Sequence, residues 1–244
     1  MQMAKCLVSE FLGTACLLAT VVGSGALMHK IDGGNVALTV MGVALATGCV
    51  LLALINTFGS TSAQFNPVVT LLSAVQKNLK WEMVAPYIAV QIVGAIVGVI
   101  VANLMFEVPA FAMSTTERTG YGQWVGEIIA TFGLVGTIIG CSRAKPDAVP
   151  SSVAAYVAGA IMFTSSTCFA NPAVTISRMF TTTITGIRAV DVLPFIAFEL
   201  LGAALAYGVF TWLFRDEKPV VPDTFVPGEK HLRLLANEPS DLIS

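Results

Sequence analysis

Two Asn-Pro pairs, Asn66-Pro67 and Asn171-Pro172, place a polar side chain inside strongly apolar sequence in each half of the chain. Asn is a favoured helix N-cap and Pro is best tolerated at the first helical position, so each pair predicts the start of a helix. The first helix, from Pro67 to Gln76, would be roughly 15 Å long, about half of a ~30 Å hydrocarbon core. One such half-helix in each half of the chain predicts a pore in which both helix N-termini lie near the middle of a membrane. There the partial positive charge of the N-termini would oppose cations, and both Asn amides would donate to one permeating oxygen.

The composition is typical of a polytopic membrane protein. Of the 244 residues, 55% are apolar and 11% are charged, whereas a soluble domain carries about 25% charged residues. The formal net charge of −2 and the lack of a basic patch argue against a nucleic-acid partner. The five cysteines form no CxxC pair and show no metal-ligand spacing, so we expect small buried hydrophobic side chains, no metal site and no cofactor.

Six apolar runs are long enough to cross a bilayer, and polar joints separate them. The runs cover residues 6–28, 36–57, 84–106, 122–141, 149–167 and 192–214. With the two half-helices, they predict an all-α membrane protein.

The two halves of the chain repeat one another. Glu10 and Glu127 lie at matching places near the start of each half, and Gln91 in the first half corresponds to Glu199 in the second. Each half contributes three spans, so the two halves must have opposite orientations in the membrane, and interrupted helices in such halves indicate a transport site. We therefore expect one channel domain over residues 1–218, with repeats at about 5–110 and 120–215, and a cytosolic tail over 219–244.

The Lys and Arg residues of the joints predict the orientation. One side would hold Lys5, Lys77, Lys80, Arg143, Lys145, Arg215 and Lys218, and the other Lys30, Arg118, Arg178 and Arg188. This bias predicts that both termini are cytoplasmic.

With these motifs the chain resembles the aquaporin and aquaglyceroporin family. The resemblance rests on Asn66-Pro67-Val68, on Asn171-Pro172-Ala173, on the repeated Glu and on the spacing of the six spans, and it covers roughly residues 5–215. It implies an hourglass fold with six transmembrane helices and two re-entrant half-helices from an inverted repeat. It also implies a homotetramer in the lipid bilayer that passes small uncharged solutes. The pattern is most similar to bacterial aquaglyceroporins linked to arsenic and metalloid resistance, so the expected location is the plasma (inner) membrane of a bacterium.

The family's narrowest constriction maps onto Thr47, Gly159, Cys168 and Val174, with Ala46 as the alternative to Thr47. Family members usually carry Arg directly after the second Asn-Pro-Ala, where this chain has Val174. Water-selective members have an aromatic residue and a His at the first two positions. The resemblance therefore implies a wide, weakly polar selectivity filter that admits glycerol, urea, arsenous acid and antimonous acid as well as water.

Other polar residues have two interpretations each. Arg178 follows Val174 by one helical turn, so it either overhangs the outer vestibule or, the interpretation favoured here, reaches the headgroups as a surface residue. Charged groups such as Glu10 and Glu127 are expensive inside apolar spans. The resemblance implies that they accept hydrogen bonds from the re-entrant loops, and a proton relay is the alternative. Cys168 is expected to face the pore and to make the channel sensitive to mercurials.

A secondary active transporter is the alternative function, because inverted repeats and interrupted helices also suit alternating access. It would need a coupling-ion site, and Glu10 and Glu127 lack a clear set of Asp or His partners nearby. An intramembrane enzyme is disfavoured, since His29 and His231 lie outside the spans and no nucleophile–base pair appears.

Overall fold

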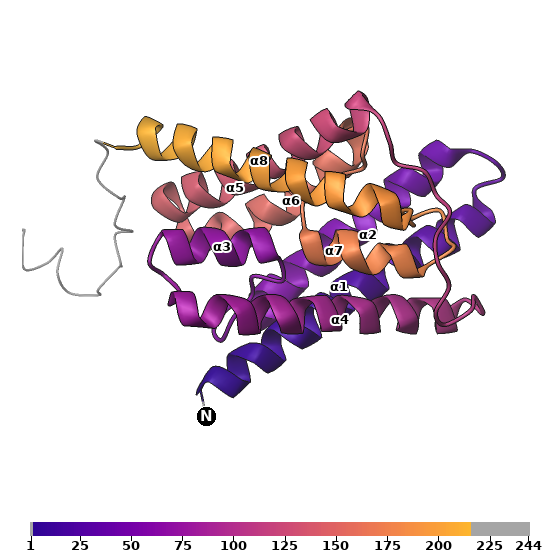
Figure 1. The fold of residues 1–244 in the computed structure, drawn as a ribbon, viewed down its shortest axis with the longest axis horizontal. Coiled ribbons are helices and arrows are strands. Elements are labelled where there is room, and N and C mark those ends of the chain that lie inside the picture. The colour runs from indigo at the N-terminus through magenta and orange to yellow at the C-terminus, as the bar shows by residue number, and fades with distance from the viewer. Residues whose placement is uncertain (1, 216–244) are drawn as a thin grey trace, which may run out of the picture.

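The computed structural model describes residues 2–215, so the tail expected at 219–244 lies outside the described residues. Six helices form a bundle: α1 (Gln2–Ile31), α2 (Val36–Phe58), α4 (Val84–Met105), α5 (Tyr121–Ala144), α6 (Val149–Phe163) and α8 (Ala189–Leu213). Two short helices, α3 (Pro67–Val75) and α7 (Pro172–Ser177), lie between α4 and α8 (Figure 1). The described residues also form three single turns of 3-10 helix: η1 (Trp81–Met83), η2 (Pro146–Ala148) and η3 (Arg178–Phe180).

The bundle has two ends that differ in their connections. The end with Gln2 and the C-terminus of α8 is called the terminal face, and it lies on the left in Figure 1. The opposite end carries the segments 32–35, 106–120 and 178–188 and is called the long-loop face. Each half-helix enters from one face and begins near the centre of the bundle, so the two half-helices have opposite directions.

Five of the six bundle helices are each long and apolar enough to cross a membrane. The sixth, α6, has 15 residues, about 22 Å, and ends before the 149–167 run that the sequence predicts. At this end the Thr164 hydroxyl donates to the Ala160 carbonyl at 2.7 Å and accepts from the Cys168 N–H at 3.0 Å, so it joins the last turn of α6 to the loop that follows. The chain then turns inward through Thr167 and Cys168, which have left-handed φ values of 62° and 51°.

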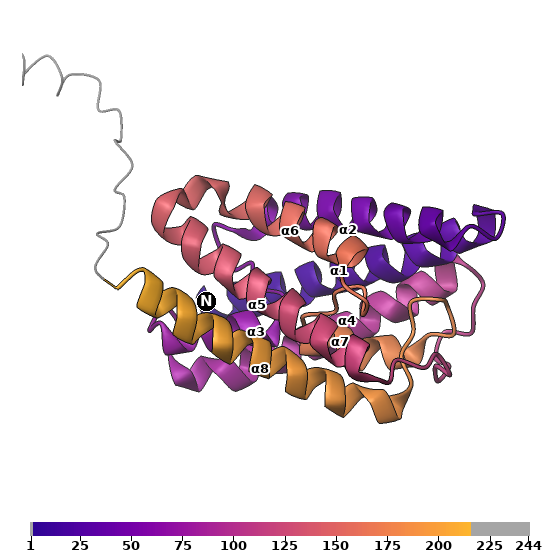
Figure 2. The same ribbon diagram turned by 90° about the horizontal axis from the view of Figure 1, so that it is seen from above.

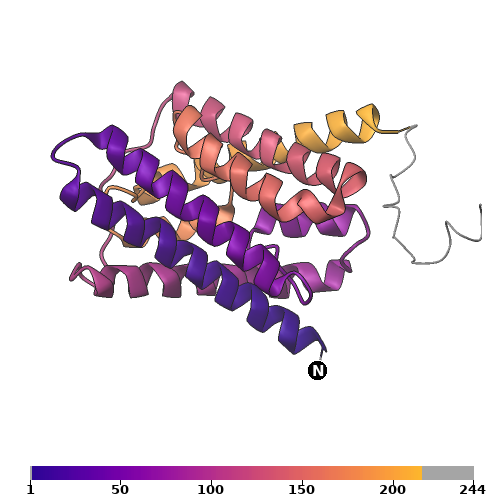
Figure 3. The same cartoon turned by 180° about the vertical axis from the view of Figure 1, so that it is seen from behind.

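The two halves pack in the same way. Helix α1 lies against α4 and α2, as α5 lies against α8 and α6, and α2 packs on α6 to join the halves (Figures 2 and 3). Matching glycines allow the closest contacts. A Cβ at Gly94 would stand 2.4 Å from the Phe11 carbonyl oxygen, and one at Gly202 would stand 2.5 Å from the Ile128 carbonyl oxygen. Small residues at such crossings let membrane helices approach one another closely.

The outer faces of the helices are apolar as well. On α4 the exposed side chains include Val93, Val97, Val101 and Leu104, spaced so that they share one face. Together with the long apolar helices, these faces make the chain a multi-pass membrane protein.

Candidate functional site

A cavity of about 300 Å³ lies between the bundle helices and the two half-helices. Its walls are mostly aliphatic, and α2 contributes a stripe at every fourth residue. The wall residues from the bundle helices are Leu17, Val21, Val36, Thr39, Val40, Val43, Thr47, Leu51, Ile55, Leu134, Ile138, Val149, Val153, Val157 and Ile161. The remaining wall comes from the two loops that precede the half-helices, from Val69 and Val174 on the half-helices themselves, and from the long-loop face.

Asn66 and Asn171 each cap one half-helix and also bind the opposite half of the chain. The Asn66 side-chain oxygen accepts from the Val68 N–H at 2.8 Å, and that of Asn171 accepts from the Ala173 N–H at 3.0 Å. Pro67 and Pro172 follow at the first helical position. These contacts are those that the Asn-Pro pairs predict.

The amide nitrogens of the same two side chains cross between the halves. Asn66 Nδ2 donates to the Ala170 carbonyl and Asn171 Nδ2 donates to the Phe65 carbonyl, each at 2.8 Å. A side-chain amide has two N–H groups, so one N–H on each Asn is left for other acceptors. Both Asn residues line the cavity, which makes these donors available to a molecule inside it.

The carbonyls that accept these bonds belong to residues with unusual backbone angles. Phe65 and Ala170 have φ values of 52° and 46°, in the left-handed region that non-glycine residues rarely adopt. This conformation sits directly before each helix cap and turns the carbonyl toward the opposite Asn. Strain of this kind persists where surrounding contacts hold the backbone in place.

Two buried carboxylates hold those backbones. Glu10 accepts from the Gln64 and Phe65 N–H groups at 2.8 and 2.7 Å. Glu127 accepts from the Phe169 and Ala170 N–H groups at 3.0 and 2.7 Å, and both carboxylates are fully buried. Each carboxylate thus supplies acceptors for loop N–H groups that no helix satisfies.

At the long-loop face two guanidinium groups, of Arg118 and Arg178, line the cavity. Both lie against the Phe169 ring, with the guanidinium carbon of Arg178 3.6 Å and that of Arg118 4.8 Å from the ring centroid. Arg118 donates to the Gly186 carbonyl at 2.8 Å and to the Ser166 carbonyl at 3.2 Å. Burial lowers the pKa of Arg118 to about 10, so this side chain is still charged at neutral pH.

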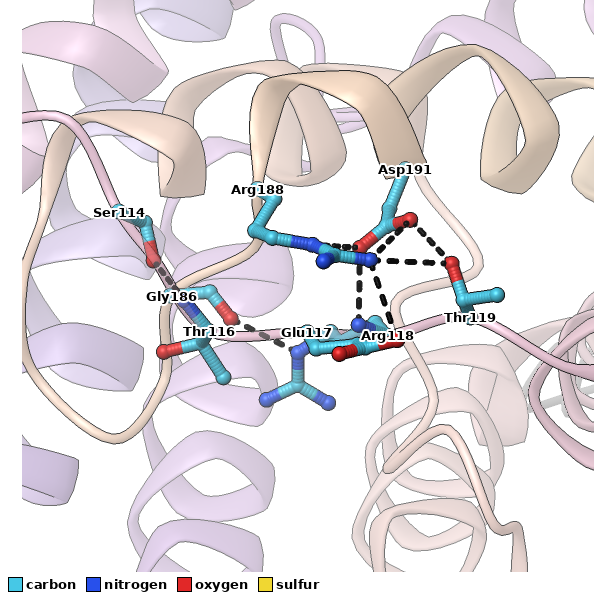
Figure 4. Close-up of polar contacts among 8 residues, drawn as sticks. All are labelled: Ser114, Thr116, Glu117, Arg118, Thr119, Gly186, Arg188 and Asp191. Atoms are coloured by element: carbon cyan, nitrogen blue, oxygen red, sulfur yellow. Dashed lines mark hydrogen bonds and ion pairs between the residues drawn. The ribbon is translucent and has the colours of Figure 1, made fainter.

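A polar network holds the loop that carries Arg118 (Figure 4). Asp191, at the start of α8, accepts from the Arg118 backbone N–H at 2.9 Å and from the Thr119 hydroxyl. Arg188 donates to the same carboxylate at 3.0 Å and pairs with Glu117 at 3.3 Å. The hydrogen bond to Asp191 raises the pKa of Arg188, so this network remains ionised over the physiological range.

Comparison with known proteins identifies the architecture. The family model described as "Major intrinsic protein" matches residues 1–170, which is more than half of the chain. The chain belongs to the major intrinsic protein family. It is 42% identical to "Aquaglyceroporin AqpS" of Rhizobium meliloti (strain 1021) over 218 residues, covering 89% of this chain and 93% of that protein. It is 29% identical to the "Glycerol uptake facilitator protein" of Streptococcus pneumoniae over 147 residues, covering 54% of this chain and 62% of that protein.

The fold comparison agrees with the family. The structure titled "X-ray structure of the aquaglyceroporin from Plasmodium falciparum" superposes with a TM-score of 0.63 at 20% identity, covering 88% of this chain and 96% of that one. The chain therefore has the fold expected from the resemblance, with six bundle helices and two half-helices, and it belongs to a family of membrane channels.

Within this major intrinsic protein fold, three of the residues mapped onto the constriction lie on the cavity wall: Thr47, Cys168 and Val174. Ala46 is not part of the wall, so of the two alternatives on α2 only Thr47 reaches the cavity. Val68 and Ala173, the residues after each Asn-Pro pair, are buried behind the wall.

Gly159 is a correction to the expected constriction. The wall residues of α6 recur at every fourth position, and Val157 and Ile161 are the last two of them. Gly159 lies two residues from both, which is about 200° around the helix, so it faces away from the cavity. A Cβ built on Gly159 would meet nothing within 4 Å. The mapping from the family pattern missed this orientation because the helical phase of α6, and not the position in the sequence, decides which side chain faces the pore.

The structure also corrects the interpretation of the arginines. Arg178 is 4% exposed, so the prediction of a surface side chain at the headgroups is wrong. Arg118 was predicted only as a loop charge, although it is a wall residue. The only signal for it in the sequence is a charged residue in the polar joint before α5.

Proposed function

We propose that this chain is a passive channel of the aquaglyceroporin type for small uncharged solutes. The proposed solutes are glycerol and the neutral metalloid hydroxides arsenous and antimonous acid, as well as water. The name of the 42% identical relative, an aquaglyceroporin, supports the class of solute. The other support comes from the residues of the cavity wall.

The observation that carries the proposal is Val174. It directly follows the second Asn-Pro-Ala and lines the cavity at the position where the family usually has Arg. A valine there removes a bulky donor from the narrow part of the pore. With Thr47 and Cys168 it forms a wide, weakly polar filter, to which Val157 and Ile161 add the α6 wall. Such a filter lowers the cost of entry for solutes larger than water and offers few hydrogen bonds in return.

The centre of the pore is proposed to reject cations and to interrupt proton transfer. Two half-helix N-termini place partial positive charge beside the cavity. The free N–H groups of Asn66 and Asn171 would both donate to one oxygen of the solute. In a water held that way, both acceptor positions of the oxygen are occupied, so it cannot accept a proton from a neighbouring water.

A channel is favoured over a secondary active transporter by the bonds between the halves. Alternating access requires one half to rock against the other around the site. Here the Asn66 amide is tied to the Ala170 carbonyl and the Asn171 amide to the Phe65 carbonyl, so the two halves are bonded together at the centre. Flux through a channel would be driven by the gradient and would not saturate, and saturable, ion-coupled flux would favour the transporter instead.

The proposed setting is the inner membrane of a bacterium, with cytoplasmic termini and four subunits. The long-loop face carries four of the Lys and Arg residues of the joints, Lys30, Arg118, Arg178 and Arg188, against seven on the side of the terminal face. This bias supports cytoplasmic termini. The apolar outer faces of the helices suit contact with lipid and with neighbouring subunits.

Stopped-flow measurements on proteoliposomes test the proposal with water, glycerol and arsenous acid. The wild-type protein is expected to raise the permeability to all three. Val174→Arg is expected to reduce glycerol and arsenous acid flux about tenfold while water flux falls less, because the long side chain fills the wide filter. Val190→Arg, at an exposed position on α8, is the matched control and should behave as the wild type.

Mercurials provide a second test of the same pore wall. Cys168 is buried in the protein but lines the cavity. Mercurials should block glycerol flux in the wild type, and Cys168→Ser should remove the block. Unchanged glycerol and arsenous acid flux in Val174→Arg, together with a block that persists in Cys168→Ser, would contradict the proposed filter.

A further inference from the structure

We propose that Arg118 and Arg178 form a binding site for small carboxylate anions at the long-loop mouth of the cavity, and that a bound anion blocks the pore. This inference rests on the proposed function only for the block, since the binding itself needs no flux. It starts from a charge count. Two cations face one cavity, the buried Arg178 and the half-buried Arg118, and within residues 2–215 neither forms a salt bridge with a carboxylate.

The direct hydrogen bonds of the two arginines all go to backbone carbonyls. Arg118 donates to the carbonyls of Gly186, Ser166 and Ile184, and Arg178 Nε donates to the Thr185 carbonyl. None of these acceptors is charged. Within residues 2–215 no salt bridge involves either side chain, whereas Arg188 nearby pairs with both Glu117 and Asp191.

The carboxylates of this region, those of Glu127 and Asp191, already bind other groups. Glu127 accepts from the Phe169 and Ala170 N–H groups behind the loop. Asp191 accepts from the Arg118 backbone N–H and from Arg188, and it does not contact the Arg118 guanidinium. Removing a charge from water without a partner is costly, so a site with two such cations favours an anion from solution.

Donors are available to bind that anion. A guanidinium has five N–H groups. Arg118 uses three of them on carbonyls, and Arg178 uses one, so its four terminal N–H groups have no partner in the described part of the chain. Arg178 is 96% buried by the protein and lines the cavity, so these N–H groups belong to the cavity wall.

The geometry suits a planar oxyanion. Both guanidinium carbons lie within 5 Å of the centroid of the Phe169 ring, which brings the two planar groups to the same part of the cavity. Guanidinium forks bind carboxylates through two parallel hydrogen bonds, and their geometry matches a carboxylate better than a spherical ion. Acetate or formate is therefore the class of ligand expected here, and chloride is expected to bind more weakly.

An anion held at this mouth would stay there. The wall next to it is mostly aliphatic, with Val174, Val157 and Ile161, and the Asn66 and Asn171 donors lie further in, at the centre of the pore. Moving a charge into such surroundings is costly, whereas a neutral solute pays much less. The site thus separates the two kinds of solute: neutral molecules pass, and carboxylates bind and obstruct the entrance.

Thermal unfolding of the purified protein in detergent measures binding independently of flux. Sodium acetate and sodium chloride are titrated at equal ionic strength, so that general screening is the same in both series. Acetate is expected to raise the unfolding midpoint of the wild type and chloride to raise it less. Arg118→Gln should weaken acetate binding about tenfold, because it removes a cation and its fork.

Matched variants separate the site from general charge effects. Lys30→Gln removes an exposed cation from the same face and should bind acetate as the wild type does. Arg118→Lys retains the charge but loses the fork, so its affinity should fall between those of the wild type and Arg118→Gln. Arg178→Gln is informative if it folds, and the Arg118 variants test the site if it does not.

Glycerol flux in proteoliposomes, with acetate at equal concentration on both sides, tests the block. Wild-type flux should fall at least twofold in saturating acetate, and Arg118→Gln should resist this inhibition. Equal effects of acetate and chloride on the wild type, or equal acetate binding by Arg118→Gln and Lys30→Gln, would overturn the inference. A wild type that binds acetate but conducts no glycerol would refute the proposed function and leave the binding site standing.

Discussion

Phe65 in the first half and Ala170 in the second perform the same backbone task with side chains of very different size. Both are left-handed, both donate their N–H to a buried Glu, and both offer their carbonyl to the opposite Asn. The residue three positions after each Glu differs in the reverse sense. It is Gly13 in the first half and Ala130 in the second. A Cβ at Gly13 would stand 1.9 Å from the Phe65 ring, so the first half needs Gly to accommodate Phe.

Gln91 and Glu199 form a second matched pair with different chemistry. Gln91 donates to Glu10 at 2.8 Å and to Thr70 at 2.9 Å. Glu199 accepts from the Thr175 hydroxyl, at the position that corresponds to Thr70. The supporting contact to the half-helix is therefore present in both halves, whether an amide or a carboxyl group makes it.

The loop residues Gln64 and Phe169 differ most in function. The Gln64 side chain accepts from Thr70 at 2.7 Å, whereas the Phe169 ring carries two guanidinium groups. The repeat thus preserves backbone acceptors and caps, which any pore of this type needs. The side chains diverge where each half faces a different end of the membrane.

The largest effect is expected from substitutions that disrupt the contact between Phe65 and Gly13. Phe65→Ala should lower the free energy of unfolding by about 4 kcal/mol, because it leaves a cavity where a fully buried ring was. Gly13→Ala should cost about 2 kcal/mol by overpacking. The double variant reproduces the Ala-Ala pair of the second half. In it the methyl added at position 13 should cost almost no free energy of unfolding, because the Phe65 ring that it would meet is gone. Denaturant titration in micelles measures the cycle, and strictly additive losses would show that the pair is not coupled.

The carboxylates come next in expected size. Glu10→Gln and Glu127→Gln should each cost about 2 kcal/mol, since a Gln side chain has one acceptor oxygen for two buried N–H groups. Glycerol flux should fall with stability, because the loops position the Asn side chains. Glu82→Gln is the control, as Glu82 is exposed on the terminal face. Full stability of both Glu variants would contradict the role of the two carboxylates in supporting the loops. It would favour a proton relay only if the variants also lost a dependence of flux on pH.

A smaller effect on stability is expected from exchanging the side chains at Gln91 and Glu199. Glu199→Gln copies the first half and should change the free energy of unfolding by about 1 kcal/mol or less, with normal flux. Gln91→Glu, the reverse exchange, places a second carboxylate beside Glu10 and should be the more harmful of the two. The same unfolding titration compares them, and a severe loss in Glu199→Gln would mean that the second half requires a carboxyl group.

The smallest effect concerns the turn between α1 and α2. The Thr39 hydroxyl and the Gly34 N–H donate to Asp32 and lower its pKa below the ordinary value of 3.8. A lowered carboxyl pKa contributes stability that is present above the unfolded-state pKa and is lost as the pH falls through the folded-state pKa. Between pH 5 and about 3 the unfolding midpoint of the wild type should therefore fall more than that of Asp32→Asn. Asp147→Asn, at an exposed position, should follow the wild type.

Much of the fold was predictable because it follows from local chemistry. An Asn-Pro pair determines where a helix begins, whatever surrounds it, and the structure begins α3 and α7 at Pro67 and Pro172. The early end of α6 was not predictable from hydropathy, because the loop that follows is held by the distant Glu127, which accepts from the Phe169 and Ala170 N–H groups. Apolar composition continues past that point while the helix does not.

The two half-helices, the repeat and the resemblance to the family follow from the amino-acid sequence alone, since caps, proline positions and charges in apolar runs act over a few residues. The packed fold was needed to show that Gly159 faces away from the cavity and that Arg118 and Arg178 share the Phe169 ring. The reason is physical: the phase of a helix against its neighbours and the path of a long loop depend on packing between segments far apart in the chain. Neither can be read from the residues nearby.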